Sequence, residues 1–248
     1  MRFKDKVVIV TGSAKGIGAE LIRKYASEGA NVVINYINSK SEAESLKEEI
    51  ENLNLGKVII VKADVSKKEE AKLLVDTTLE EFGTIDILVN NAGRYFDGDE
   101  WDLNENAWKE TLDNNLISVM NISKFVIQYF IENKKGSILN IASRMGLNSK
   151  PDAIAYSASK AGIINITTSY AKLISEFGNC NCICPGATKC GYWLRASETE
   201  LEDIVSRNPK KRLVNPKEIA ELGLFLTSDT ALMITGQTIL VDGGESLS

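Results

Sequence analysis

The feature that most constrains the fold lies at residues 7–18, near the start of the chain. Residues 7–10 are four consecutive β-branched residues, and such a run predicts a strand buried on both faces, as in a parallel sheet covered by helices. Gly12, Gly16 and Gly18 follow, and apolar residues at helical spacing begin at Ile17. A strand, a glycine turn and a helix start in this order favour binding of a dinucleotide pyrophosphate. The turn lets the backbone approach the pyrophosphate closely, and the start of the helix offers free N–H groups to it. For this stretch alone, an ordinary strand-to-helix loop is the alternative interpretation.

The rest of the chain repeats the alternation of apolar runs and amphipathic segments. We expect further strands within residues 31–36, 57–61, 85–89, 136–143, 180–185 and 234–244, and helices at about 39–53, 67–82, 105–133, 156–177 and from 216 onwards. This alternation predicts an α/β fold, a Rossmann-type doubly wound parallel sheet of about seven strands with helices on both faces. No stretch rich in Pro, Gly and Ser divides the 248 residues. We therefore predict a single NAD(P)-binding domain spanning residues 1–248.

Composition limits the partners of the chain. The net charge of −5 argues against nucleic acid, because no basic surplus exists to meet phosphates. No run approaches the ~20 apolar residues of a membrane span, and residues 1–6 lack the apolar core of a signal peptide. We therefore expect a cytoplasmic protein that binds neither nucleic acid nor membrane.

The chain contains no histidine, which excludes Ser-His-Asp and Cys-His catalysis and histidine-ligated metal sites. Any general acid or base must therefore be another residue with a tuned pKa. The cysteines cluster at Cys180, Cys182, Cys184 and Cys190, without a C-x-x-C pair. A thiolate metal site is conceivable there, but we expect small, buried side chains and no metal.

Further motifs follow in a fixed order along the chain. The fourth predicted strand ends in Asn-Asn-Ala-Gly at residues 90–93, and the fifth ends at Ser143. Tyr156 comes thirteen residues later and Lys160 four residues after that, so both share one face of a helix. Together with Thr-Gly-x-x-x-Gly-Ile-Gly at residues 11–18, these motifs resemble the short-chain dehydrogenase/reductase family over essentially the entire chain. Within that family, length and motif order are most similar to 3-oxoacyl-[acyl-carrier-protein] reductases.

The resemblance implies a nicotinamide dinucleotide cofactor. The second strand ends at Tyr36 without the carboxylate that grips the adenosine ribose, and Lys15 and Lys40 are cations suited to a 2′-phosphate. We therefore predict NADP(H), with NAD(H) as the alternative, although the family's usual second arginine would fall at Asn38. The cofactor-binding residues that the resemblance implies are Gly12, Ser13, Lys15, Gly16, Ile17, Gly18, Tyr36, Asp64, Val65, Asn91, Ala92, Gly93, Tyr156, Lys160, Pro185, Gly186 and Thr188.

The same resemblance assigns catalysis to Asn115, Ser143, Tyr156 and Lys160. Tyr156 would give a proton to the substrate oxygen or take one from it, with a pKa lowered by Lys160 and by the nicotinamide cation. Ser143 would hold the carbonyl oxygen, Lys160 would also hold the nicotinamide ribose, and Asn115 would hold a water through a kink in its helix. The hydride belongs to the cofactor.

The substrate pocket is expected beside these motifs, under a predicted lid of one or two short helices at about 187–212. Arg94 and Arg144 directly follow two of the motifs, and each either faces an anionic substrate or lies on the surface. The pocket candidates are Arg94, Tyr95, Ser143, Arg144, Tyr192 and Trp193, with Phe96 at the pocket mouth.

The predicted reaction interconverts a carbonyl and a secondary alcohol, with an NADPH-dependent 3-oxoacyl reductase as the first hypothesis. A dehydrogenase of a sugar, polyol or other small alcohol is the alternative within the family, and a catalytically silent dinucleotide-sensing protein is the alternative outside catalysis. The predicted partners are a small-molecule carbonyl or alcohol substrate and, for the first hypothesis, an acyl-carrier protein. The resemblance also implies a homotetramer, with a homodimer as the alternative.

Overall fold

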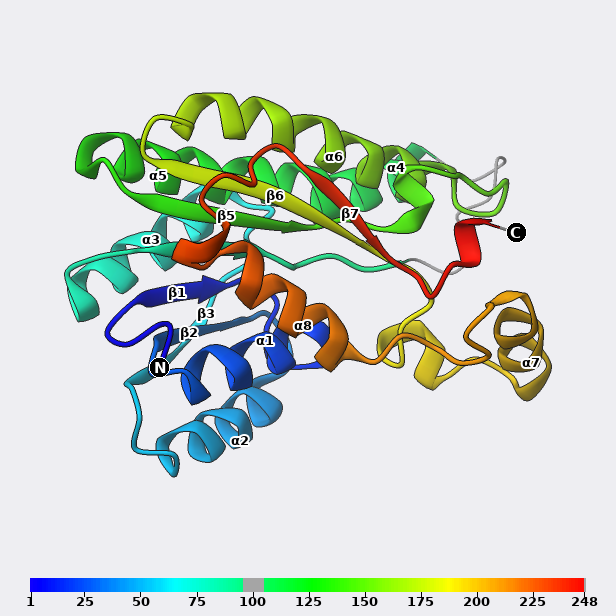
Figure 1. The fold of residues 1–248 in the computed structure, drawn as a ribbon, viewed down its shortest axis with the longest axis horizontal. Coiled ribbons are helices and arrows are strands. Elements are labelled where there is room, and N and C mark those ends of the chain that lie inside the picture. The colour runs from blue at the N-terminus through cyan, green and yellow to red at the C-terminus, as the bar shows by residue number, and fades with distance from the viewer. Residues whose placement is uncertain (96–104, 248) are drawn as a thin grey trace.

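The computed structural model describes residues 1–95 and 105–247, and these residues build a seven-stranded, all-parallel sheet (Figure 1). The strand order is β3-β2-β1-β4-β5-β6-β7, which confirms the predicted doubly wound Rossmann-type sheet. The strands are β1 (Val7–Val10), β2 (Asn31–Tyr36), β3 (Val58–Lys62), β4 (Ile87–Asn90), β5 (Gly136–Ile141), β6 (Gly178–Pro185) and β7 (Thr238–Val241). The order reverses between β1 and β4, and ligands of such sheets bind at the carboxyl ends of the strands near this point.

Helices cover both faces of the sheet (Figure 1). They are α1 (Gly16–Ser27), α2 (Lys40–Glu51), α3 (Lys68–Phe82), α4 (Glu105–Leu112), α5 (Ser118–Asn133), α6 (Ile154–Ile174), α7 (Glu198–Arg207) and α8 (Pro216–Leu226). One hydrophobic core lies between the sheet and α1, α2 and α8, and a second lies under α3, α5 and α6. Within the described part of the chain, no helix is long and apolar enough to cross a membrane.

The position of β1 explains the apolar run near the start of the chain. β1 pairs with β2 on one side and with β4 on the other, and all four of its residues are buried. Val8 and Val10 pack into the core under α1, whereas Ile9 packs into the core on the opposite face. A central parallel strand covered on both faces is expected to be apolar on both faces, which accounts for this run.

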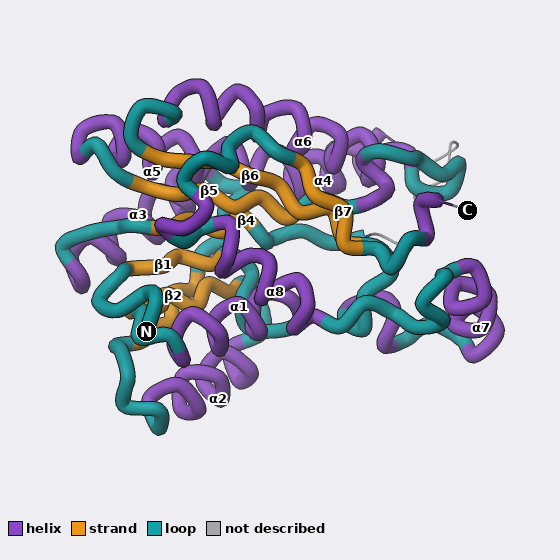
Figure 2. The backbone as a smooth tube through the Cα atoms, viewed as in Figure 1, coloured by secondary structure: helices purple, strands orange, loops and turns teal. Residues whose placement is uncertain are grey.

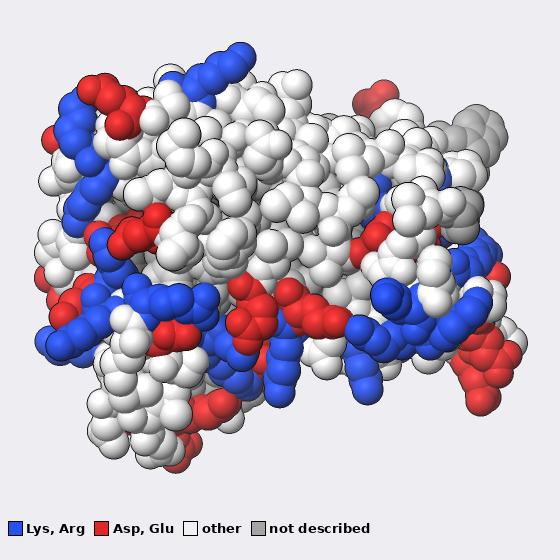
Figure 3. Space-filling model, in the orientation of Figure 1, with Lys and Arg blue, Asp and Glu red and all other residues white. Residues whose placement is uncertain are grey.

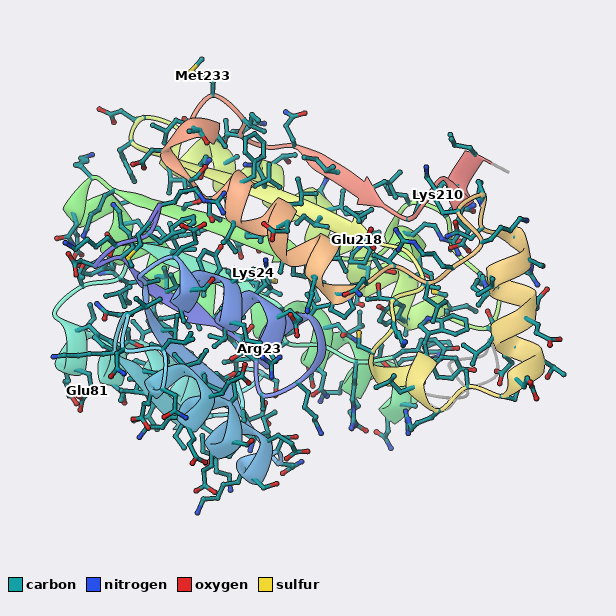
Figure 4. The ribbon with its side chains drawn as sticks, turned by 60° about the horizontal axis from the view of Figure 1, so that its bottom comes forward. Arg23, Lys24, Glu81, Lys210, Glu218 and Met233 are labelled. Atoms are coloured by element: carbon teal, nitrogen blue, oxygen red, sulfur yellow. The ribbon has the colours of Figure 1, made fainter. Side chains whose placement is uncertain are left out.

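Ion pairs on the outer surface join α1 to its neighbours. Arg23 Nε lies 2.9 Å from Oε1 of Glu49 on α2, and Lys24 pairs with Glu221 on α8. Figure 4 labels both basic side chains on the surface of α1. The buried apolar face of α1, which includes Leu21, supplies the main packing energy, because exposed ion pairs contribute little.

The predicted helix at 105–133 is divided in the structure. A π-helical turn at Asp113–Ile117 separates α4 from α5, and it contains the buried Asn115. Turns of this kind insert an extra residue into a helix and are frequent at functional sites. The kink that the resemblance implied at Asn115 takes the form of this turn.

The carboxyl end of the sheet carries the predicted lid. Residues 187–212 contain a 3₁₀ turn at Gly191–Leu194 and α7, and α7 projects beyond the body of the sheet (Figure 2). A capping box between Ser197 and Glu200 fixes the start of α7. A second capping box between Asn215 and Glu218, followed by Pro216 in the first turn, starts α8.

Candidate active site

The turn between β1 and α1 packs closely against the segment that follows β4. Gly12 has a φ of +60°, and a Cβ there would lie 2.9 Å from the Cα of Ala92. A Cβ on Gly18 would lie 2.6 Å from Nδ2 of Asn91. Both positions therefore require glycine, and the N-cap residue Lys15 makes no side-chain cap hydrogen bond at the start of α1. These residues fit the pyrophosphate of a dinucleotide, since the N–H groups of a helix start bind anions.

Thr11 joins the ends of β1 and β4, a role that the sequence motifs did not reveal. Its Oγ1 accepts hydrogen bonds from the backbone N–H groups of Asn91 and Ala92, both at 3.0 Å. In return, Nδ2 of Asn91 donates to the carbonyl oxygens of Thr11 and Gly12 at 2.9 and 3.1 Å. The two motifs that were expected to contact the cofactor are thus one hydrogen-bonded unit.

Asn35 supports the same loop from β2 and was also missed. Its Oδ1 accepts a hydrogen bond from the backbone N–H of Gly12 at 3.0 Å, and its Nδ2 donates to the carbonyl oxygen of Ala63 at 2.9 Å. Ser13, a predicted cofactor residue, is fully buried and donates its hydroxyl to the carbonyl oxygen of Val10 at 2.7 Å. An amide in an otherwise apolar strand was the available signal, because buried polar groups need partners.

The residues expected at the adenosine end lie together after β2 and β3. Tyr36 is buried, and its carbonyl oxygen accepts the N–H of Ala63 at 3.0 Å. Asp64 accepts hydrogen bonds from the N–H and the hydroxyl of Ser66 at 3.1 and 2.6 Å, and Val65 is buried. Asp64 therefore organises the loop into α3, and its contact with the adenine stays a prediction.

Both lysines expected to bind a 2′-phosphate pair with glutamates of α2. Lys15 Nζ lies 3.2 Å from Oε1 of Glu42, and Lys40 Nζ lies 3.5 Å from Oε1 of Glu44. The Lys15–Glu42 pair is exposed, so salt and solvent screen it strongly. Glu42 places a carboxylate beside the predicted 2′-phosphate site, and nothing in the local motif signalled it.

Ser143, Tyr156 and Lys160 meet where β5 ends and α6 begins. The Ser143 side chain forms a hydrogen bond with Tyr156, and its Oγ accepts the N–H of Met145 at 3.1 Å. Lys160 Nζ lies 5.7 Å from the centre of the Tyr156 ring and donates to the carbonyl oxygen of Ile141 at 3.1 Å. The structure thus brings Ser143, which lies just after β5, together with Tyr156 and Lys160 on one face of α6.

Asn115 and Lys160 both lie beside Gly93. A Cβ on Gly93 would lie 2.5 Å from Oδ1 of Asn115 and 3.3 Å from Nζ of Lys160. Oδ1 of Asn115 accepts the N–H of Arg94 at 2.8 Å, and its Nδ2 donates to the carbonyl oxygens of Arg94 and Thr111, both at 3.0 Å. The π turn therefore ties Asn115 to the Asn-Asn-Ala-Gly segment.

Burial shifts the pKa values of Tyr156 and Lys160 in opposite directions. It raises the pKa of the Tyr156 phenol, and the hydrogen bond with Ser143 offsets this only in part. It lowers the pKa of Lys160 to about 8, although Cys182 and Cys184 act in the opposite direction. The expected net lowering of the Tyr156 pKa is therefore not found among the groups of this chain, and the part assigned to the nicotinamide cation stays a prediction. Desolvation of the phenol outweighs a cation that bonds to a backbone carbonyl instead.

The cysteines lie on β6 and in the loop after it. Cys180, Cys182 and Cys184 are buried, and the pKa of Cys180 is raised by burial. Cys184 accepts the backbone N–H of Ser143, and a hydrogen bond with Cys182 lowers the Cys184 pKa. Among residues 1–95 and 105–247, no group of three or more Cys, Asp or Glu side chains is placed to hold a metal ion.

The loop after β6 closes against the glycine turn. Gly186 donates its N–H to the carbonyl oxygen of Val241 at 3.0 Å, and Thr188 Oγ1 donates to the carbonyl oxygen of Gly186 at 2.9 Å. A Cβ on Gly16 would lie 3.3 Å from the Cβ of Cys190. Cys190, in the loop after β6, therefore lies beside the start of α1, and the contact of Pro185 and Gly186 with the nicotinamide stays a prediction.

Aromatic side chains line the predicted substrate side of Tyr156. The Tyr95 ring lies edge-on to Tyr156 with ring centres 5.5 Å apart, and edge-on to Tyr192 at 5.6 Å. Trp193 continues the series, 5.2 Å from Tyr192, and the Tyr192 hydroxyl bonds to Glu200 of α7. The predicted lid is thus connected to Tyr156 through rings. Phe96 lies outside the described residues.

The two arginine candidates have different surroundings. Arg94 is exposed, and its Nη2 lies 2.6 Å from Oε1 of Glu110. Arg144 is buried, and its Nη2 lies 2.7 Å from Oε1 of Glu245. Arg94 lies on the surface, whereas Arg144 does not, because it forms a buried ion pair with the C-terminal segment; a contact of either with an anionic substrate stays a prediction.

Comparison with known proteins extends these observations to the whole chain. A family model described as Enoyl-(Acyl carrier protein) reductase matches residues 12–246. The 3-oxoacyl-[acyl-carrier-protein] reductase FabG of Thermotoga maritima is 37% identical over 245 residues, which cover 98% of this chain and 99% of the relative. The protein of the same name from Chlamydia muridarum is 36% identical over 241 residues, 97% of each chain. A crystal structure of a putative short-chain dehydrogenase/reductase from Burkholderia xenovorans superposes with a TM-score of 0.88, at 27% identity and 98% coverage of both chains.

Proposed function

Because this chain belongs to the short-chain dehydrogenase/reductase family of NAD(P)-dependent oxidoreductases, we propose that it interconverts a carbonyl and a secondary alcohol, and that its substrate is a 3-oxoacyl thioester. The observation that carries the proposed chemistry is the hydrogen-bonded pair of Ser143 and Tyr156, with Lys160 behind the phenol ring. This group lies beside the glycine turn, so a dinucleotide held there would reach it.

The residues of the chain move and hold the proton. Tyr156 donates its phenolic proton to the oxygen that becomes an alkoxide, and Ser143 donates a hydrogen bond to that oxygen. The nicotinamide, when bound, supplies or accepts the hydride. A raised pKa keeps Tyr156 protonated at neutral pH, and a protonated phenol serves reduction of a carbonyl.

Lys160 and Asn115 support this proton transfer. Lys160 is buried, with a pKa of about 8, and its proposed roles are to hold the nicotinamide ribose and to replace the proton that Tyr156 loses. Asn115 is fixed to the backbone of Arg94, next to Gly93 and Lys160. This placement supports its proposed role in holding a water near the ammonium group.

The walls of the site support an apolar acyl chain over a sugar or polyol. Tyr95, Tyr192 and Trp193 present rings on the substrate side, whereas polyhydroxylated substrates need several polar partners. The relatives with 37% and 36% identity are named as 3-oxoacyl-[acyl-carrier-protein] reductases. We propose NADP(H) as the cofactor on account of Lys15, with NAD(H) as the alternative on account of Glu42.

An oligomer is proposed from the exposed apolar surface near β7. Leu232 and Met233 are 55% and 97% exposed, Leu240 on the edge strand is 41% exposed, and Leu173 on α6 is 56% exposed. Figure 4 labels Met233 at the tip of the loop before β7, and Figure 3 shows a broad uncharged surface over α6 and β7. Such patches mark protein contacts. A homotetramer, or a homodimer, would cover this face, and light scattering of the purified protein measures which forms.

The test is oxidation of NADPH, with NADH alongside, on an acetoacetyl thioester and on a panel of simple ketones and ketoses. We expect turnover of the thioester with NADPH, and a loss of at least about a hundredfold in Tyr156→Phe. Activity confined to ketones or sugars would remove the substrate proposal and keep the Tyr156 chemistry. Nucleotide binding without turnover on any carbonyl would favour the dinucleotide-sensing alternative. Carrier-linked acetoacetate, compared with its coenzyme A thioester, tests the acyl-carrier partner.

A further inference from the structure

Arg144 is a buried charged side chain that the proposed proton transfer does not use. Its Nη2 lies 2.7 Å from Oε1 of Glu245, and the two side chains are 11% and 5% exposed. An ion pair this deeply buried is costly to break, because either charge left alone would be desolvated and uncompensated. Arg144 is therefore held by Glu245 and does not extend towards a substrate.

One end of the pair is joined to Ser143. Arg144 opens the 3₁₀ turn Arg144–Gly146, and the N–H of Met145 in that turn donates to Oγ of Ser143 at 3.1 Å. The same Ser143 side chain bonds to Tyr156. A shift of the turn would therefore move the hydroxyl that faces the substrate oxygen.

The other end of the pair belongs to the C-terminal segment. Glu245 opens the 3₁₀ turn Glu245–Leu247. Asp242 fixes that turn, because its carboxylate accepts the N–H groups of Gly244 and Ser246 at 2.9 and 3.0 Å. Asp242 also accepts, at its carbonyl oxygen, the Nδ2 of Asn208 at the end of α7, at 2.8 Å.

Gly186 lies between the two ends, after β6. A Cβ on Gly186 would lie 2.8 Å from the Cβ of Asp242 and 3.4 Å from Oε2 of Glu245. Since β6 lies between β5 and β7 in the sheet, the Arg144–Glu245 pair spans the ends of three neighbouring strands. β5 leads to Ser143 and β6 leads to the loop at Gly186, whereas β7 leads to the C-terminal segment that carries Glu245.

We propose that Arg144 and Glu245 are positioning residues, which hold the turn after Ser143 and the loop at Gly186 so that the Ser143 hydroxyl keeps its orientation towards Tyr156. The proposal rests on the proposed function, since the pair acts only through Ser143. It predicts that loss of the Glu245 charge matters to catalysis only while Ser143 is present.

The experiment is a double-mutant cycle with Glu245→Gln and Ser143→Ala, followed by kcat and KM for the acetoacetyl thioester. Glu245→Gln is expected to lower kcat/KM at least about tenfold, mainly through kcat, because small misplacements of reacting groups are costly. In the Ser143→Ala background the same substitution is expected to lower it by less than about twofold. Asp76→Asn, which breaks the exposed 2.6 Å pair with Lys72 on α3, is the matched control and is expected to change neither constant.

A second variant covers the case in which Glu245→Gln does not fold. Arg144→Met with Glu245→Met removes both buried charges and leaves neither unpaired. It is expected to fold and to show the same dependence on Ser143. Equal fractional losses with and without Ser143, or full activity of a folded variant, would overturn the positioning role. Full activity of Ser143→Ala alone would instead reject the proposed function.

Discussion

Replacing Thr11 by valine tests whether the joint between β1 and β4 holds the candidate site. Thr11 is 1% exposed, and its Oγ1 accepts the backbone N–H groups of Asn91 and Ala92, both at 3.0 Å. Valine has nearly the same shape but no oxygen. The substitution therefore removes one acceptor from two backbone donors without creating a cavity.

The cost follows from the groups that lose their partner. A buried donor left unsatisfied costs about 1–3 kcal/mol. Asn91 and Ala92 are half-buried, so water satisfies them in part and the lower half of that range applies to each. The Val89 carbonyl loses only a weak 3.4 Å bond and keeps the N–H of Thr11 at 3.0 Å. We expect Thr11→Val to lower the free energy of unfolding by about 2–4 kcal/mol.

Urea unfolding at one fixed protein concentration measures this change, since assembly would otherwise shift the apparent stability. Thr11→Ser keeps the oxygen and is the control, with an expected loss of about 1 kcal/mol for the missing methyl group. We also expect weaker nucleotide binding in Thr11→Val, because the Asn-Asn-Ala-Gly segment loses its anchor. A valine variant within about 0.5 kcal/mol of the wild type, or a serine variant that is equally destabilised, would refute the reasoning.

Three further perturbations test separate parts of the site. The folded chain holds the pKa of Lys160 at about 8, below its ordinary 10.5, so the unfolded state binds more protons between these pH values. The free energy of unfolding therefore rises as pH rises through that window. Urea midpoints at pH 7.5, 9 and 10 should show that Lys160→Met lacks this gain, and parallel pH profiles of the two proteins would contradict it. Glu42→Gln frees Lys15, and fluorescence titration should show about twofold to fivefold tighter NADPH binding with NADH unchanged; equal effects on both nucleotides would exclude a 2′-phosphate contact. Gly12→Ala forces a Cβ to 2.9 Å from Ala92 at a φ of +60°, and thermal unfolding should show a loss of about 1–3 kcal/mol, whereas an unchanged melting temperature would mean that the loop adjusts freely.

Local patterns predicted the sheet because the apolar run of each strand indicates by itself that the strand is buried. Val8, Ile9 and Val10 are apolar in succession, and the structure buries them in two cores on opposite faces. Helix boundaries moved by a few residues at most, with the exception of the π turn at Asp113–Ile117. That turn depends on bonds from Asn115 to the distant Arg94, which helical spacing does not encode.

Contacts between distant segments account for what the sequence did not predict. Thr11 and Asn35 were not recognised as anchors of the glycine loop, because their partners lie on other strands. The pairing of Arg144 with Glu245 has the same origin. A motif records which residue types recur at a spacing, whereas the partner of a buried charge is set by which segments the sheet brings together.

The pKa of Tyr156 likewise depends on surroundings that the sequence motif does not record. The i to i+4 spacing correctly placed Lys160 on the face of α6 that carries Tyr156. The net pKa of a phenol beside a cation falls below its ordinary value only if the field of the cation exceeds the cost of desolvating the phenolate. Here Lys160 is itself desolvated, bonds to the Ile141 carbonyl, and leaves the pKa of Tyr156 raised. The chain's own residues therefore favour a protonated Tyr156.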